Sequence, residues 1–417
     1  MATLWSFRNE TAMNHRLLKA SIGLLCGYAA VLVAPAFAAE VYYQPIAIIS
    51  AENNSNVDLD LGKQPQVQGY VADVATIVGI DTPNSTTIIR PRVVYRDYPK
   101  DSGDDRFEGY LDFSSAWHTQ RSNASLQGSY QHLDEFNAEH TVAFFDDIAG
   151  GAQPTPDTGR TVVGASRDSE VLAPKYIYSF SPIISGGVSG DYQRVTYSPS
   201  DDTSHLNFDF YQARAFATYS ASPRFDWSLG GFGSQFKTKD VDSRATGSGA
   251  VADFTGNWTP LLQTNAELLY QHTDINTTIP TPLITQINKV GGSVDIGYKS
   301  EVDRFRLILK RSISPSGGGA VYTLDRIQFQ YDRSFTERFT MTAAIIGIKT
   351  HGLTPNLEGD DRKYAQSIIE AHYNLTRRFF VQGGYQYSWQ RYQNDPDSAT
   401  NNRIYIEFGY QGLGQQR

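Results

Sequence analysis

Polar and apolar residues alternate with a period of two along many segments of this chain. Successive side chains of a β-strand point to opposite faces, so the alternation predicts strands with one apolar and one polar face. Many segments exceed ten residues, whereas strands of soluble proteins cluster near ~5 to 6 residues and ~9 to 11 tilted residues cross a bilayer. The pattern therefore predicts an all-β, transmembrane antiparallel β-barrel of about eighteen strands. The segments are 42–51, 66–79, 86–98, 105–119, 123–134, 169–180, 183–197, 206–219, 224–237, 247–258, 261–271, 288–299, 303–313, 321–333, 338–350, 363–375, 377–391 and 403–411.

The connections between these segments alternate in length. Long connections rich in Asp, Asn, Gly, Pro and Ser follow the odd-numbered segments, and short turns follow the even-numbered ones. This is the arrangement of bacterial outer-membrane barrels, with short periplasmic turns and long outer loops. Several short turns also share a repeat in which a Tyr closes one segment and Arg-Phe opens the next, and aromatic rings of this kind favour a membrane interface. The repeats are Tyr219 with Arg224-Phe225, Tyr298 with Arg304-Phe305, Tyr331 with Arg338-Phe339 and Tyr373 with Arg378-Phe379.

The first 38 residues are typical of a secretory signal peptide. Arg16 and Lys19 precede an apolar run over 20–34, and Ala36-Phe37-Ala38 gives a cleavage site of small residues. We therefore expect a signal peptide over 1–38 and one barrel domain over 39–417, located in the outer membrane of a Gram-negative cell. The only cysteine, Cys26, lies in the signal. After residue 38 no apolar run approaches the ~20 residues of a membrane helix.

Removing the signal takes away three of the 36 basic and one of the 44 acidic residues, which leaves a net charge of about −10. This balance argues against nucleic acid as a partner. Only a few residues separate Ala38 from the first segment, so we expect no plug domain before the barrel. A closed barrel of eighteen strands is wide enough for a water-filled lumen, which predicts a channel.

The chain resembles a family of outer-membrane proteins named "putative β-barrel porin 2". The resemblance extends over the mature chain and is carried by the runs 42–57 (YYQPIAIISAENNSNV), 69–82 (GYVADVATIVGIDT), 88–99 (IIRPRVVYRDYP), 107–113 (FEGYLDF) and 134–139 (DEFNAE). It implies an outer-membrane barrel and says little about cargo. Some relatives resemble barrels associated with export of extracellular polysaccharide, which implies polysaccharide and a periplasmic export protein as partners.

Basic residues share one face of two predicted strands. Arg90, Arg92 and Arg96 alternate with apolar residues, and Arg304, Arg306 and Lys310 repeat the arrangement. A basic side chain on the lipid face costs ~2 to 4 kcal/mol near the midplane, so these residues are expected to line the lumen. The full predicted lining is Arg90, Arg92, Arg96, Glu108, Asp112, Arg304, Arg306, Lys310, Arg326 and Glu407. Two interpretations remain open: a basic lining that attracts anions, or a wall in which these cations pair with Glu108, Asp112, Glu370 and Glu407.

The longest connection, 135–168, is acidic. We expect it to fold into the lumen and narrow it, with Glu139, Asp146 and Asp147 opposite the arginines near residue 92. The alternative is an extracellular lid or a surface loop.

No sequence motif indicates an enzyme, a cofactor or a metal site. A hydrolase using Ser129 or Ser388 on the barrel wall is a remaining alternative. The leading hypothesis is a porin-like channel for passive passage of polar or charged solutes. The alternatives are the outer-membrane barrel of a polysaccharide export system and a non-conducting structural or adhesion barrel. The expected partners also include outer-membrane lipid, lipopolysaccharide and the barrel-assembly machinery that recognises an aromatic-rich final strand.

Overall fold

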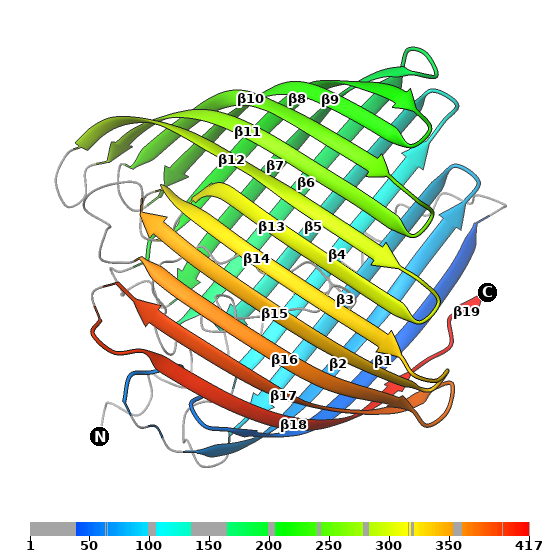
Figure 1. Cartoon of the computed structure of the whole chain (residues 1–417), viewed down its shortest axis with the longest axis vertical. Helices are drawn as coiled ribbons and strands as arrows, with labels where there is room; N and C mark the ends of the chain where they lie inside the picture. Colours follow the sequence, from blue (N-terminus) through cyan, green and yellow to red (C-terminus); the bar gives the residue numbers. More distant parts are fainter. Residues whose placement is uncertain are drawn as a thin grey trace, which may run out of the picture.

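The computed structural model describes residues 39–62, 64, 66–98, 106–134, 165–198, 205–239, 243–277, 283–315, 317, 321–352, 361–393 and 395–416. These residues form one antiparallel sheet that closes on itself (Figure 1). The strands are β1 Glu40–Asn54, β2 Val67–Thr82, β3 Ser85–Asp97, β4 Arg106–His118, β5 Ser122–Asp134, β6 Ser166–Ser179, β7 Ile184–Ser198, β8 Phe208–Ser222, β9 Phe225–Thr238, β10 Arg244–Asn257, β11 Leu262–Thr277, β12 Leu283–Lys299, β13 Asp303–Pro315, β14 Val321–Ser334, β15 Phe339–Gly352, β16 Arg362–Asn374, β17 Phe379–Tyr392, β18 Ala399–Gln411 and the short β19 Gln415–Gln416.

Each long strand pairs with its neighbours in sequence, and β1 also pairs with β18. Ile46 to Asn54 lie opposite Gln411 to Arg403, which closes the barrel. The two residues of β19 pair with the N-terminal part of β1, opposite Tyr42 and Tyr43. The eighteen long strands agree with the number predicted from the alternation. Turns of two to four residues follow the even-numbered strands, and most of the longer connections lie at the other end.

Most strand ends lie within four residues of the prediction. The two larger differences concern one hairpin: β11 continues to Thr277 rather than 271, and β12 begins at Leu283 rather than 288. Polar residues made this region resemble a loop, yet the inward side chains Thr273 and Ile275 are buried. The hairpin is thus longer than its apolar pattern, because its outward residues lie beyond the apolar part of the surface. Among the described residues, no helix is long and apolar enough to span a membrane.

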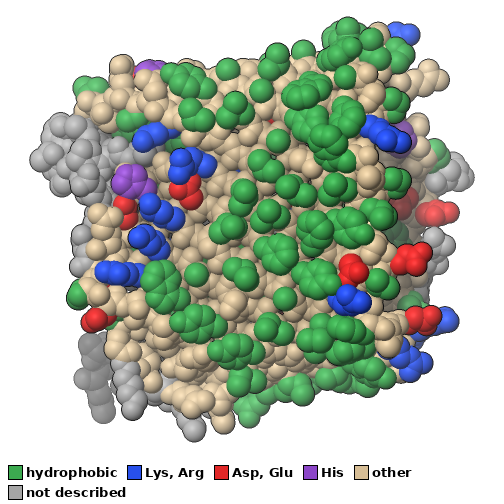
Figure 2. Space-filling model, in the orientation of Figure 1, with side chains coloured by type: hydrophobic (Ala, Val, Ile, Leu, Met, Phe, Trp, Pro, Cys, Tyr) green, Lys and Arg blue, Asp and Glu red, His purple; other side chains and the backbone are tan. Residues whose placement is uncertain are grey.

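The outer surface carries a broad apolar band (Figure 2). Large exposed side chains such as Leu229, Leu268 and Ile404 belong to it. Aromatic rings lie together at the short-turn end: Tyr298 stacks on Phe305 with centroids 5.4 Å apart, and similar pairs form at neighbouring turns. The outward residues of all strands together thus form one apolar belt around the barrel, with aromatic rings along its edge at the short turns.

Aromatic rings cover glycines on the interior side of several strands. The Phe380 ring, which is 2% exposed, lies directly over Gly409 on the paired strand. Tyr98 covers Gly69 and Tyr42 covers Gly79 in the same way. The absence of a Cβ gives each ring its place, as in aromatic rescue of glycine within sheets.

We expect Gly409→Val to destabilise the barrel by about 1 to 3 kcal/mol, because the new side chain overlaps the Phe380 ring. The measurement is the urea midpoint of unfolding in detergent, followed by heat-modifiable migration on gels. Gly297→Ala is the matched control, since a Cβ there meets no atom within 4 Å. Equal midpoints for the two variants would contradict the packing argument.

Candidate functional site in the barrel interior

The interior face of the barrel can be identified from contacts that pass over a strand. Arg214 on β8 contacts Asp253 on β10, and its Nη1 lies 3.3 Å from Glu267 Oε2 on β11. Only the concave side of a closed sheet brings side chains of non-adjacent strands so close. Residues that share this parity on each strand therefore face the lumen.

The three arginines predicted on one face of β3 lie on the interior face, while Val93 and Tyr95 are exposed outside. Arg92 Nη2 lies 2.7 Å from Asp73 Oδ2 on β2. Arg96 Nε lies 3.3 Å from Glu108 Oε1 on β4, and the Tyr110 hydroxyl donates to the same carboxylate at 2.9 Å. Arg90 stands opposite Asp112 in the β3–β4 register. Arg92 and Arg96 therefore form ion pairs along the wall, whereas Arg90 forms none with the described residues.

The arginines of the second predicted group, on β13, also form ion pairs with acids on the adjacent strands. Arg304 lies 2.9 Å from Asp332 on β14, and Arg306 lies 2.5 Å from Asp295 on β12. Pairing of luminal cations was one of the two interpretations of the sequence. Of the acids expected as partners, Glu108 pairs with Arg96, and the acids Asp73, Asp332 and Asp295 are further partners that the sequence did not indicate. Glu370 accepts a hydrogen bond from the Tyr405 hydroxyl at 2.6 Å, and Glu407 lies opposite Gln382 in the β17–β18 register.

Lys310 and Arg326 lie opposite each other in the β13–β14 register. Among the described residues neither makes an ion pair, and Arg326 donates to Gln328 at 2.8 Å. Both line an interior cavity of about 410 Å³ that also contains Asp191 on the facing strand β7. We call these two residues the luminal cation pair. With Arg214 and Arg311 they make four cations in the cavity lining, against the two acids Asp191, which interacts with Lys310, and Glu267.

Glu52 on β1 is the centre of a buried network that the sequence did not indicate. Its carboxylate accepts a hydrogen bond from the Tyr98 hydroxyl at 2.7 Å and lies 2.6 Å from Arg403 on β18. The Glu52 side chain is 1% exposed. Tyr98 follows β3, and burial together with the Glu52 charge raises the pKa of its phenol. The network joins the first and last long strands where the barrel closes.

A second pairing lies at the rim. Arg106 is 2.5 Å from Asp58 in the first long connection and 3.4 Å from Asp134 at the end of β5. Burial and the neighbouring Asp58 charge raise the pKa of Asp60. These contacts hold the first connection against the barrel.

Two apolar clusters narrow the interior at the end with the long connections. Leu59, from the first connection, is 4% exposed and packs with apolar residues of β14 to β16. Its φ of 51° lies in the left-handed region, which costs energy for a residue with a Cβ and indicates that its packing fixes the conformation. The cluster consists of Leu59, Tyr322, Leu324, Ile346, Ile348, Tyr364 and Ala399.

The second cluster brings β14 against strands that are not its neighbours. Val321, at the start of β14, packs against Phe208 on β8 and Ile275 on β11. Nearby, the Leu206 backbone N–H donates to the Gly317 carbonyl at 2.6 Å. We call this contact the cross-lumen cluster; it consists of Val195, Tyr197, Phe208, Phe236, Ala245, Ile275 and Val321. The constriction predicted for the connection 135–168 involves Glu139, Asp146 and Asp147, which lie outside the described residues.

The interior also contains a set of glutamine side chains on β14 and β17. Gln328, Gln330 and Gln390 are only 3 to 4% exposed, so they belong to the packed wall rather than to a surface open to cargo. Within the described part of the chain, no group of three or more His, Cys, Asp or Glu residues could hold a metal ion.

No known protein-family profile matches the chain, and no curated protein matches it. The resemblance to a porin family noted in the sequence therefore stays a prediction. Among solved structures, the chain is similar to OccK2 (OpdF) of Pseudomonas aeruginosa, with 12% identity, coverage of 89% of this chain and 98% of that one, and a TM-score of 0.44. It is also similar to OpdK of the same organism with vanillate (12% identity, 90% and 99% covered, TM-score 0.43). The ferric-catecholate import receptor Fiu of E. coli matches at 10% identity, with 86% and 69% covered and a TM-score of 0.40.

Proposed function

We propose that this chain is a porin-like channel of the Gram-negative outer membrane, through which polar or charged solutes pass without chemical reaction. The observation that carries the proposal is the closed barrel of eighteen long strands, apolar outside and charged inside. A membrane position satisfies the apolar belt, and closure leaves no unpaired sheet edge between β18 and β1. Assembly would follow export of the chain and insertion by the barrel-assembly machinery.

The direct test is conductance. Purified, folded protein should give discrete current steps in planar lipid bilayers. A complete lack of steps under all voltages and salts, with the protein verified as folded, would favour a non-conducting structural barrel instead. The export alternative gains no specific support from Gln328, Gln330 and Gln390, because these interior amides are buried.

We expect the luminal cation pair to favour anions. A unit charge at ~4 Å in water contributes about 1 kcal/mol, so Lys310→Gln should lower the anion-to-cation permeability ratio a few-fold. The measurement is the reversal potential in a salt gradient.

Lys237→Gln is the matched control for this test. Lys237 is an exposed lysine on the outer face of β9, where the alternate residues Trp227 and Leu229 are also exposed. Its loss should leave the reversal potential unchanged, and equal shifts for both variants would contradict a role for the interior charge.

A further inference from the structure

The barrel wall is incompletely paired between β12 and β13. The register joins Gly292–Lys299 of β12 to Arg311–Arg304 of β13 and ends there. Residues 283 to 291 of β12 consequently have no register partner on β13. Figure 1 shows the two strands together near the short turns and diverging toward the other end. The cross-lumen cluster lies at this end of the barrel, where Val321 at the start of β14 belongs to one cluster with residues of β7 to β11.

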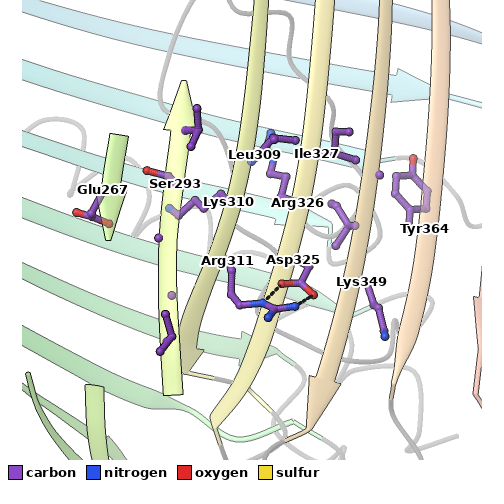
Figure 3. Close-up of a pocket in the computed structure, with 16 residues that line it drawn as sticks. Glu267, Ser293, Leu309, Lys310, Arg311, Asp325, Arg326, Ile327, Lys349 and Tyr364 are labelled. Carbon is purple, nitrogen blue, oxygen red and sulfur yellow. Dashed lines mark hydrogen bonds and ion pairs between the residues drawn. The ribbon is translucent and has the colours of Figure 1, made fainter. Parts of the chain in front are cut away.

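A cavity of about 710 Å³ lies where the two strands part (Figure 3). Residues from both faces of the wall line it. Lys310 and Arg326 belong to the interior face, whereas Leu309, Arg311 and Ile327 belong to the outer face. The cavity therefore connects the outer surface with the lumen, and it shares Glu267, Lys310, Arg311 and Arg326 with the interior cavity of about 410 Å³. We call it the lateral opening.

The charges around the lateral opening are mainly positive. Lys310 and Arg326 approach from inside, and Arg311 and Lys349 from outside. The acidic residues in the lining are Asp325, which pairs with Arg311 at 2.6 Å, and Glu267, which pairs with Arg214 at 3.3 Å. The opening thus retains positive charge after its described ion pairs are formed.

A row of charged residues continues from the opening across the outer face. In register, Arg311 lies opposite Asp325, Asp325 opposite Lys349, Lys349 opposite Lys363, and Lys363 opposite Arg391. Like charges directly opposite each other destabilise a sheet. A bound anion would therefore stabilise the three adjacent cations Lys349, Lys363 and Arg391. Figure 2 shows Lys and Arg side chains gathered at this end, beside the apolar band.

The apolar residues around the opening lie closer to the short turns than the charges do. Leu309 and Ile327, two residues from Arg311 and Asp325, are 42% and 49% exposed, and Val290 is 57% exposed. An acyl chain could pack on these apolar residues. The head group of the same lipid would then lie beside the cations, which are closer to the end of the barrel with the long connections. Phosphate is the suitable head group, because guanidinium and ammonium groups bind its oxygens through charge-assisted hydrogen bonds.

We propose that the lateral opening is a binding site for a phosphorylated glycolipid of the outer leaflet. The phosphate lies among Arg311, Lys349 and the luminal cation pair, and the acyl chains lie on Val290, Leu309 and Ile327. The proposal rests on the membrane position given under the proposed function. It adds a lateral connection between the lumen and the outer leaflet.

The test measures binding of bisphosphorylated lipid A to detergent-purified, folded barrel by native mass spectrometry. Arg311→Gln combined with Lys349→Gln should weaken binding at least tenfold, and so should Lys310→Gln combined with Arg326→Gln. Arg338→Gln combined with Arg378→Gln removes two exposed basic residues from the short turns and should leave the affinity within twofold of the wild type.

Two further ligands identify what is recognised. Inorganic phosphate should bind far more weakly than lipid A, and fully dephosphorylated lipid A should bind at the level of the outer double variant. Equal binding of the phosphorylated and dephosphorylated lipids would overturn the proposal, as would wild-type affinity in both site variants. If only the outer variant loses affinity, the lipid binds the charged row without entering the opening, and the lateral connection is wrong. A barrel that binds lipid in this pattern but gives no current would refute the channel and leave the lipid site standing.

Discussion

Glu52→Ala should lower the free energy of unfolding by about 2 to 3 kcal/mol, because it leaves the partly buried guanidinium of Arg403 without its carboxylate partner. Arg403 lies 2.6 Å from the Glu52 carboxylate, and the Tyr98 hydroxyl donates to the same group. The Tyr98 hydroxyl loses this acceptor, and among the described residues Arg403 keeps only the amide oxygen of Gln386, at 3.3 Å, in a wall where the Glu52 side chain is 1% exposed. The measurement is the urea midpoint in detergent, with the fraction of compact protein followed by heat-modifiable migration.

Two further variants test whether the effect comes from the Glu52–Arg403 ion pair or from the loss of any negative charge on β1. Glu40→Ala changes an exposed residue at the start of the same strand and should leave the midpoint unchanged. Glu52→Leu combined with Arg403→Met replaces the ion pair by apolar side chains and should recover most of the lost stability. A midpoint for Glu52→Ala equal to that of Glu40→Ala would show that the network contributes nothing measurable.

Strand number and facing were predictable because period two is a local property. On β18, Ile404 and Ile406 are exposed outside and Tyr405 is buried, as the alternation predicts. The stretch 339–350 was ambiguous, since apolar residues occupy both faces there. The structure places Ile345 outside and Ile346 in an interior cluster. The second face is apolar because the interior itself holds an apolar cluster at this end.

Ion-pair partners were not predictable in the same way. The sequence grouped Arg90, Arg92 and Arg96, but Asp73 faces Arg92 only through the β2–β3 register. Glu52 and Arg403 are 351 positions apart and meet because β1 and β18 close the barrel. Such pairs depend on register between strands, and a single sequence gives only the period within each strand.

The cross-lumen cluster was missed for a related reason. Val321 was assigned to a strand edge next to a Gly-rich connection, with no signal that it packs against strands three or more places away. Leu59 was likewise part of a predicted loop. The available sequence signal for such packing is a single apolar residue in a polar connection. It indicates that the residue is buried but does not identify the residues it packs against.

The largest functional effect should come from Val321→Asp. Val321 is 5% exposed within the cross-lumen cluster, and burying an unpaired carboxylate among apolar side chains costs several kcal/mol. The chain can avoid this cost by releasing the ends of β13 and β14 from β7 to β11. A bias of about 3 kcal/mol shifts a two-state equilibrium more than a hundredfold, so the wider state should dominate single-channel recordings. Ile284→Asp, at an 80% exposed position at the same end of the barrel, should keep the wild-type conductance, and Val321→Ile should keep the cluster closed. If folded Val321→Asp conducts like the wild type, the cross-lumen cluster does not limit the pore, and the constriction must lie elsewhere along the wall.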